Sequence, residues 1–436
     1  MSGRAGAGTS PGAGTRRFLR AVRSGWSRYR GTVLPLAIGL LSVLALLKLG
    51  TELYRLLVDT GFHGAIDLRL RYQEVQAWFE GRPVYTELSR LTYPPQAYVM
   101  LWPFTGWLSW EGARWVWALT SLAALAWLCA LVLRETGTTG GAERGLAIAM
   151  IVGMNAVGVT IGNGQLIVHV LPALVAALLL LRRPRAAWYV DAGTAALLLF
   201  ALVKPTLSVP FAWLAMLTTR RVRPLAWTVI GYSLLTLGAA AFQPENAFTL
   251  VAQWAAQGGS DLGEGYGDVH SGLLAIGQER WAAAASLLLL AGLGIWTWSR
   301  RQSDPWVLLG VTAIVARLWT YHRSYDDVLI VLPMVALLRI AAHPDSDEWD
   351  AVRAGLLLAV AIPVMATPAA LVGGVDSSLF VGSHVAVWLV MLLFLARLPS
   401  AALPIRLSPP PPPPPPPSGA AARARTSRRA RRHPPG

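Results

Sequence analysis

The sequence is poor in charged residues and in cysteine. Charged side chains form 14% of its 436 residues, about half the share found in an ordinary soluble domain. The single cysteine, Cys129, excludes an internal disulfide and a cluster of thiolate metal ligands. Neither a Walker phosphate-binding loop nor a Rossmann glycine motif after a strand is present. These absences exclude a conventional cytoplasmic globule and argue against a nucleotide-binding domain.

Apolar residues make up most of the chain. Hydrophobic residues account for 54% of it, and nineteen of its residues are tryptophan. Uninterrupted Leu, Ala and Val stretches approach the roughly 20 residues that a membrane-spanning helix needs. The sequence therefore predicts an all-α, polytopic transmembrane protein.

The formal net charge of +15 comes almost entirely from the two ends of the sequence. Seven arginines precede Thr32 and seven follow Pro399, and neither stretch contains an acidic residue. Charge confined to the ends of a membrane protein sets its orientation or contacts anionic membrane lipid. We therefore expect no nucleic-acid partner.

Twelve apolar segments are predicted to span the membrane. The first, Val33–Val58, follows a basic stretch and is interpreted as an uncleaved signal anchor. An even number of spans places both termini and the short arginine-rich loops in the cytoplasm, as the positive-inside rule requires. The other eleven segments are Ala113–Leu133, Gly145–Ile161, Leu166–Leu181, Trp188–Val203, Thr206–Leu217, Pro224–Phe242, Trp281–Trp298, Trp306–Trp319, Val328–Ile340, Ala354–Val372 and Val385–Leu398.

The tryptophan-rich segment Gln96–Trp110 is interpreted as a re-entrant or interfacial helix, because a span there would move every later basic loop outside.

Nine consecutive prolines after Ser408 predict an extended, disordered spacer. The predicted domains are a cytoplasmic Arg-rich tail (1–31), a transmembrane domain (32–399) and a disordered polyproline and Arg-rich cytoplasmic tail (400–436). Within the transmembrane domain, the large external loops are predicted at 58–111 and 243–280.

Polar motifs collect in the predicted external loops and turns. In chain order they are Asp67 with Tyr72 five residues later, Gly81-Arg-Pro-Val-Tyr85, Tyr93-Pro94-Pro95, Gly164-Gln165, Lys204-Pro205 and Tyr321-His-Arg-Ser-Tyr-Asp-Asp327. This ordered set resembles glycosyltransferase family 87, whose bacterial members are membrane enzymes of the GT-C fold. Many of them are mannosyltransferases that use a polyprenyl-phosphate sugar.

The resemblance implies inverting transfer of a hexose, with mannose as the expected sugar, from a polyprenyl-phosphate donor to an outward-facing glycan or glycolipid acceptor. The enzyme would lie in the plasma membrane with its active site facing outside. The alternative is a multi-span transporter or lipid-linked-sugar flippase. That alternative predicts ionisable residues near the bilayer midplane and an internal repeat, and neither is clear in the sequence.

Asp67 is the predicted catalytic base. Sugar transfer from a lipid phosphate requires a group that takes the proton of the acceptor hydroxyl, and a carboxylate near the membrane surface can do so. The resemblance implies the same role for Asp67. The alternative is that Asp67 only caps the amphipathic stretch Leu68–Phe79. Asp59 is a weaker candidate, because it stands where the first span ends.

Three side chains are predicted to bind the donor phosphate. Lys204, one of only two lysines, stands at a proline-broken turn between two short apolar segments. Arg323 can clamp a phosphate with two hydrogen bonds, and His322 can assist. The alternatives are a snorkelling lysine, and an Arg323 that only pairs with Asp326 or Asp327.

Four polar side chains are predicted to contact the sugar or the acceptor, and each has a structural alternative at the membrane interface or at a helix end. They are Tyr72, Tyr85, Asn163 and Gln165. No metal ligand is predicted and no cofactor is expected. A divalent cation is not required, because cationic side chains can neutralise the leaving phosphate. The loop residues Asp261, Glu264, Asp268 and His270 do not match a standard cation site, and a solvated, flexible loop is the preferred interpretation.

Overall fold

The computed structural model describes residues 13–61, 63–88, 93–135, 140–219, 221–258, 266–343, 346–375 and 377–399. In these ranges the secondary structure is helical, without a strand. The predicted tail 400–436, most of the first basic stretch, Arg220 and the loop acids Asp261 and Glu264 lie outside the residues whose side chains are described. The all-α prediction is confirmed for the described part of the chain.

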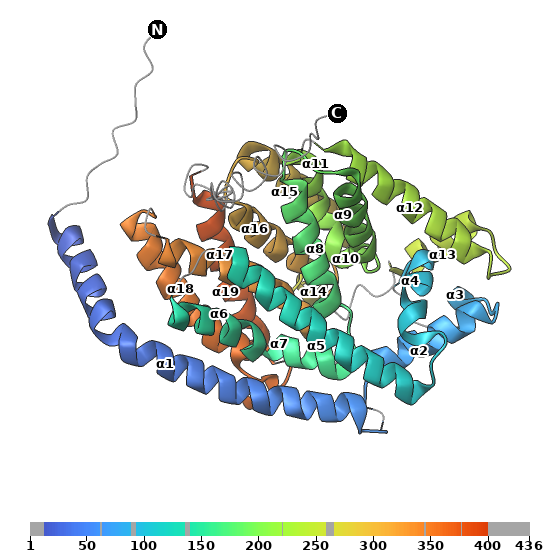
Figure 1. The fold of residues 1–436 in the computed structure, drawn as a ribbon, viewed down its shortest axis with the longest axis horizontal. Helices are drawn as coiled ribbons and strands as arrows, with labels where there is room; N and C mark the ends of the chain where they lie inside the picture. Colours follow the sequence, from blue (N-terminus) through green and yellow to red (C-terminus); the bar gives the residue numbers. More distant parts are fainter. Residues whose placement is uncertain are drawn as a thin grey trace, which may run out of the picture. The chain divides into compact units, whose positions relative to one another are not determined.

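The helices follow one another with short connections (Figure 1). The first part of the chain forms α1 (Ala13–Leu57), α2 (Ile66–Phe79), α3 (Val84–Glu87), α4 (Pro95–Thr105), α5 (Trp110–Glu135), α6 (Gly141–Gly153), α7 (Asn155–Asn163), α8 (Ile167–Leu181) and α9 (Trp188–Ala201). The middle forms α10 (Pro205–Ser208), η1 (Val209–Phe211), α11 (Ala212–Leu217), α12 (Val222–Ala240), α13 (Ala247–Gly258) and α14 (Val269–Ala275). The last part forms η2 (Glu279–Trp281), α15 (Ala282–Arg300), α16 (Pro305–Leu318), η3 (Ser324–Ile330), α17 (Val331–Ala342), α18 (Glu348–Ala366), η4 (Ala369–Val372) and α19 (Ser378–Arg397).

Four segments form the core of the helical fold. Most residues of α8, α16 and α17 are buried, as expected for helices that are apolar on nearly every side. Most residues of η3 are buried as well, including Asp326 and Asp327. The helices around them turn apolar side chains outward, and Leu46 of α1 and Leu288 of α15 are each 73% exposed. Soluble proteins rarely expose apolar surface on this scale, so membrane lipid is the medium that these side chains fit.

Five helices among the described residues are long and apolar enough to cross a membrane, or up to seven if two bent pairs each form one span. The five lie in α1, α5, α15, α18 and α19, and the pairs are α6 with α7 and α9 with α10 to α11. Helices α8 and α16 are apolar but shorter. The predicted count of twelve spans is therefore not confirmed, because several predicted spans form helices that are too short to cross upright.

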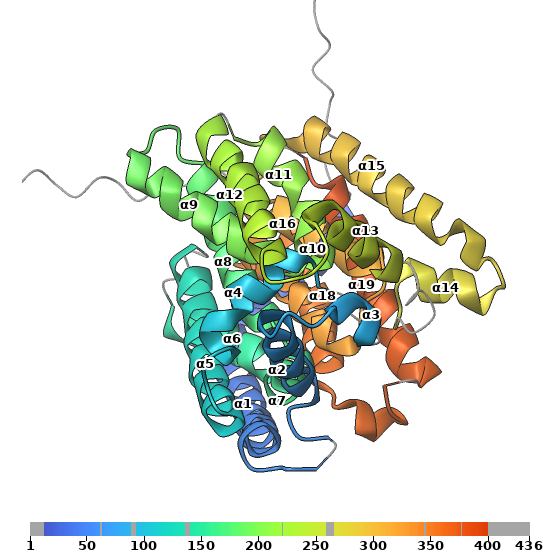
Figure 2. The same ribbon diagram turned by 90° about the vertical axis from the view of Figure 1, so that its right-hand side faces the viewer.

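The segment Gln96–Trp110 contains the short helix α4, which begins at Pro95 and ends at Thr105. Eleven residues extend only about 16 Å at 1.5 Å per residue, far less than the bilayer core. Helix α4 packs against α2, α5, α12 and α13 (Figure 2). Its length agrees with the prediction of a segment that does not cross.

Two breaks between helices bring distant polar residues toward α2 and η3. The chain bends by 115° between α9 and α10, at Lys204 and Pro205. A proline at the first position of α10 is compatible with the start of a helix but not with a continuous one. Helix α7 ends at Gly164, whose φ of 74° closes the helix in the left-handed conformation that glycine adopts without strain. The two breaks present Lys204 and Gln165 at the ends of helices.

Candidate functional site

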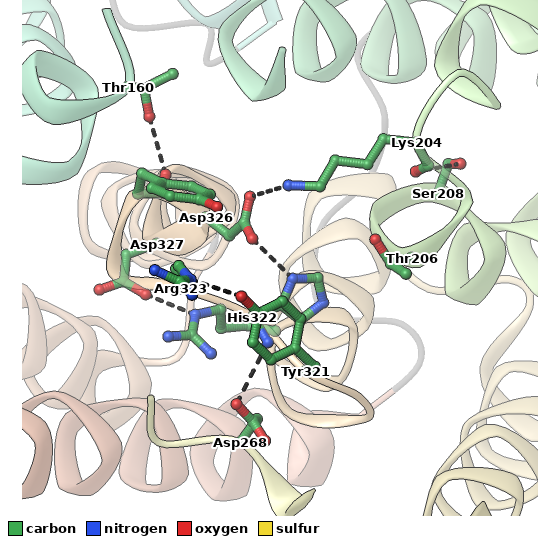
Figure 3. A network of polar contacts seen from close by, with 12 residues as sticks. Thr160, Lys204, Thr206, Ser208, Asp268, Tyr321, His322, Arg323, Asp326 and Asp327 are labelled. Atoms are coloured by element: carbon green, nitrogen blue, oxygen red, sulfur yellow. Dashed lines mark hydrogen bonds and ion pairs between the residues drawn. The ribbon is translucent and has the colours of Figure 1, made fainter. Parts of the chain in front are cut away.

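Asp326 joins two side chains from different parts of the chain (Figure 3). The Lys204 Nζ donates to its Oδ1 at 2.9 Å, and the His322 Nδ1 lies 3.0 Å from its Oδ2. The Lys204 ammonium also lies 5.2 Å from the centre of the Tyr325 ring. Burial alone would raise the pKa of Asp326, but Lys204 and His322 hold it well below its usual range. Lys204 is therefore a paired, largely buried cation, unlike the snorkelling alternative.

The two acids of the turn, Asp326 and Asp327, pair with Lys204 and Arg317. Asp327 accepts from the Arg317 Nε at 2.6 Å, and Asp326 is engaged as described. The Arg323 Nε donates to the Tyr321 hydroxyl at 2.5 Å, and the side chain is only half-buried. Arg323 is therefore a half-buried cation beside Tyr321.

The end of the predicted second external loop packs on this turn. The backbone N–H of Tyr266 donates to the His322 carbonyl at 3.0 Å, and the Asp268 Oδ2 accepts from the His322 N–H at 3.3 Å. Asp268 also caps α14 through Ser271, and His270 lies 2.7 Å from the Ser286 hydroxyl. The expectation of a solvated loop was wrong for Asp268 and His270, because both side chains are buried and contact His322, just before η3, and Ser286 of α15.

Asp67 lies in the first turn of α2, where it meets residues from three other segments. Its carboxylate accepts a side-chain hydrogen bond from Gln165 and interacts with the charges of Arg71, Lys204 and Arg323. Burial raises the pKa of Asp67, while the hydrogen bond and the three cations oppose that rise. Part of the side chain stays exposed. Asp67 is not the helix cap that the structural alternative required, because that position belongs to Ala65.

Gly164 explains how Gln165 reaches Asp67. A Cβ at Gly164 would lie 2.4 Å from the Leu68 Cβ, closer than two non-bonded carbon atoms can approach. Helix α2 and the turn after α7 therefore touch at a point where only glycine fits. The contact places Gln165, the next residue, beside Asp67.

Three of the four predicted sugar contacts have partners inside the protein. The Tyr72 hydroxyl donates to the Leu108 carbonyl at 3.0 Å, and the Tyr85 hydroxyl donates to the Tyr93 carbonyl at 2.7 Å. Arg55 donates to the Asn163 Oδ1 at 2.9 Å. Tyr85 is also buried, so its position does not support the predicted sugar contact. Gln165 is the one member of this predicted set that lies against Asp67.

Sequence reasoning missed Arg71 and Glu74 on α2. The Arg71 Nη2 lies 2.6 Å from the Glu74 Oε1, and both side chains are buried. Burial raises the pKa of Glu74 to about 7, although the Arg71 charge opposes the rise. The signal was present in their spacing, since residues four and seven positions after Asp67 lie on its side of a helix. No cluster of metal-ligating side chains is found among the described residues.

The fold and these contacts define a helical protein with several apolar candidate membrane spans and a polar site built from four separate segments. The family model of glycosyltransferase family 87 matches residues 91–320, which is more than half of the sequence. The chain belongs to this family, as its motifs had indicated, and is a glycosyltransferase. The transporter alternative is thereby set aside. No curated protein and no solved structure matches the chain.

The matched range contains Lys204 and Gln165 but ends just before His322 and Arg323. It begins after Asp67 and Tyr85. The positions of Asp67 and Arg323 in the site therefore come from the three-dimensional contacts described above.

Proposed function

We propose that this glycosyltransferase moves a hexose, with mannose as the expected sugar, from a polyprenyl-phosphate donor to an outward-facing glycan or glycolipid. The proposal places the enzyme in the plasma membrane as a multi-pass protein, with both termini in the cytoplasm and the site at the outer face. The outward-facing apolar side chains of its helices suit an isoprenoid tail. A lipid-borne donor also fits a sequence without a nucleotide-binding motif.

The proposal rests on one observation: the carboxylate of Asp67 interacts with two cations from distant parts of the chain, Lys204 and Arg323. Asp67 lies beside Gln165 and interacts with Lys204 and Arg323. A general base and a positively charged phosphate site must be neighbours for direct sugar transfer, because the acceptor oxygen and the leaving phosphate occupy opposite sides of one carbon atom.

In the proposed step, Asp67 takes the proton from the acceptor hydroxyl as its oxygen attacks the anomeric carbon. The bond between that carbon and the phosphate oxygen breaks, and polyprenyl phosphate leaves with the electron pair. Arg323 and Lys204 stabilise the charge on the phosphate. One N–H of the Lys204 ammonium bonds Asp326, and an ammonium carries three. His322 supports this arrangement through Asp326, and Gln165 orients the carboxylate of Asp67.

Substitution of Asp67 by Asn tests the base. The variant keeps the size of the side chain but removes the proton acceptor, so transfer from radiolabelled polyprenyl-phosphate mannose in membranes should fall by about 10²- to 10⁴-fold. Asp59→Asn is the matched control, because the Asp59 carboxylate accepts a local hydrogen bond from the Gly61 N–H at 2.8 Å and is not among the groups that act on Asp67. A well-folded Asp67→Asn enzyme with the wild-type rate would overturn the assignment.

A further inference from the structure

One face of α2 carries three ionisable side chains in succession. Asp67, Arg71 and Glu74 stand at spacings of four and three residues, which are neighbouring positions on a helix. Arg71 is 7% exposed and Glu74 is 4% exposed. Charged side chains are almost never buried to this degree unless they are paired. The middle residue of the three, Arg71, interacts electrostatically with both acids.

The Arg71 guanidinium is held in place on two sides. Its Nη2 lies 2.6 Å from the Glu74 Oε1, and its central carbon lies 4.5 Å from the centre of the Tyr93 ring. The Arg71 Nη1 and the Glu74 Oε2 are buried and make no hydrogen bond within the part of the chain that the structure describes. The Arg71 guanidinium therefore forms an ion pair with Glu74 and also interacts electrostatically with Asp67.

We infer that Glu74 is a positioning residue for sugar transfer, which acts through Arg71 on the base strength of Asp67. This inference rests on the proposed function, because it takes Asp67 as the base. When Glu74 is ionised it compensates the charge of Arg71, and Asp67 then holds a proton more strongly. When Glu74 is neutral, the whole charge of Arg71 acts on Asp67 and makes it a weaker base.

Among the described residues, the other side chains that interact electrostatically with Glu74 are phenols. The side chains that interact with it electrostatically, besides Asp67 and Arg71, are Tyr85 of α3, Tyr93 before α4 and Tyr98 of α4. Burial raises the pKa of all three phenols, so they stay neutral.

The two remaining helices that pack on α2 are α5 and α7, and neither contributes a group that shifts the pKa of Glu74. Glu111 and Arg114 lie at the N-terminal end of α5. The charges that act on Arg114 are those of Arg69, Glu111 and Asp59. Helix α7 contains no titratable residue. Because burial raises the pKa of Glu74 to about 7, its charge changes near neutral pH, and the base strength of Asp67 should change with it.

The pH dependence of kcat between pH 5 and 9, measured with polyprenyl-phosphate mannose in membranes, tests the inference. Wild-type kcat should rise through an inflection near pH 7. Glu74→Gln should lack that inflection and shift the acid limb to lower pH. Its kcat at pH 8 should fall by about 3- to 10-fold, because rate follows base strength only in part. The KM for the donor should be unchanged.

Two variants separate positioning from folding. Glu74→Asp keeps the carboxylate and should keep the inflection. Glu80 is an exposed acid at the C-terminal end of α2, and it pairs with Arg82 at 3.1 Å. Glu80→Gln should therefore leave the pH profile unchanged. A Glu74→Gln profile that superimposes on that of wild type, even at reduced protein level, would overturn the inference. If instead Asp67→Asn transfers sugar normally, the proposed base itself has failed.

Discussion

Lys204 is the cation whose charge and packing can be separated most cleanly. Its ammonium is paired with Asp326 and interacts with Asp67, so it stands between the proposed base and the turn that carries Arg323. Lys204→Gln keeps most of the side-chain volume and removes the charge. A charge-assisted hydrogen bond is worth about 1.5–3 kcal/mol. The KM for the donor should therefore rise by about 10- to 100-fold, with little change in the KM for the acceptor.

The other lysine provides the control for this measurement. Lys48 pairs with Glu52 on α1 at 2.8 Å, and it is not among the groups that interact with Asp67. Lys48→Gln should leave the KM for the donor near the wild-type value. If Lys204→Gln uses the donor as well as the wild-type enzyme does, Lys204 is a structural ion pair and the phosphate site must be sought around Arg323.

At the scale of elements, the contact between α2 and the end of α7 sets the position of the base. Gly164→Ala adds a Cβ where only 2.4 Å separates it from the Leu68 Cβ, and it also forces alanine into a positive φ of 74°. The left-handed conformation alone costs about 1–2 kcal/mol. We expect α2 to move away from Gln165 and kcat to fall by at least about 10-fold, since a small misplacement costs about 10²-fold.

A second glycine shows whether the effect is local. Gly193 lies within α9, and a Cβ built there meets no atom within 4 Å. Gly193→Ala should therefore retain activity and, because alanine favours helix, gain slightly in thermal stability. Equal activity in Gly164→Ala and Gly193→Ala would mean that the contact between α2 and α7 does not position Asp67.

At the scale of the whole molecule, the orientation in the membrane is open to a direct test. The only cysteine, Cys129, is buried in α5, so Cys129→Ser provides a background for single-cysteine labelling. Gly81 and Arg183 are both exposed. A cysteine at position 81 should react with an impermeant maleimide from outside, and a cysteine at position 183 should react only after the membrane is opened. Labelling of both from one side would contradict the interpretation of Gln96–Trp110 as a segment that does not cross.

Local sequence patterns were enough to predict the helical class and the presence of several long apolar helices. Apolar run length and the proline and glycine positions act over a few residues, which is why the break at Lys204-Pro205 was predicted and is present as a 115° bend. The predicted count of twelve spans was not confirmed. Whether a short apolar helix crosses the membrane depends on the neighbouring helices that cover its ends. The family assignment rested on the order of several motifs and was confirmed over residues 91–320.

The tertiary structure alone decided which of these polar residues meet. Asp67 and Gln165 are 98 positions apart, and Lys204 and Asp326 are 122 apart, so no local spacing could have joined them. Packing between distant segments also buries Asp268, which was expected to lie in a solvated loop, against the backbone of His322. The Tyr85 hydroxyl, predicted to contact a sugar, donates to the Tyr93 carbonyl. Buried charges require partners, and the partners are chosen by how helices pack rather than by the order of residues along the chain.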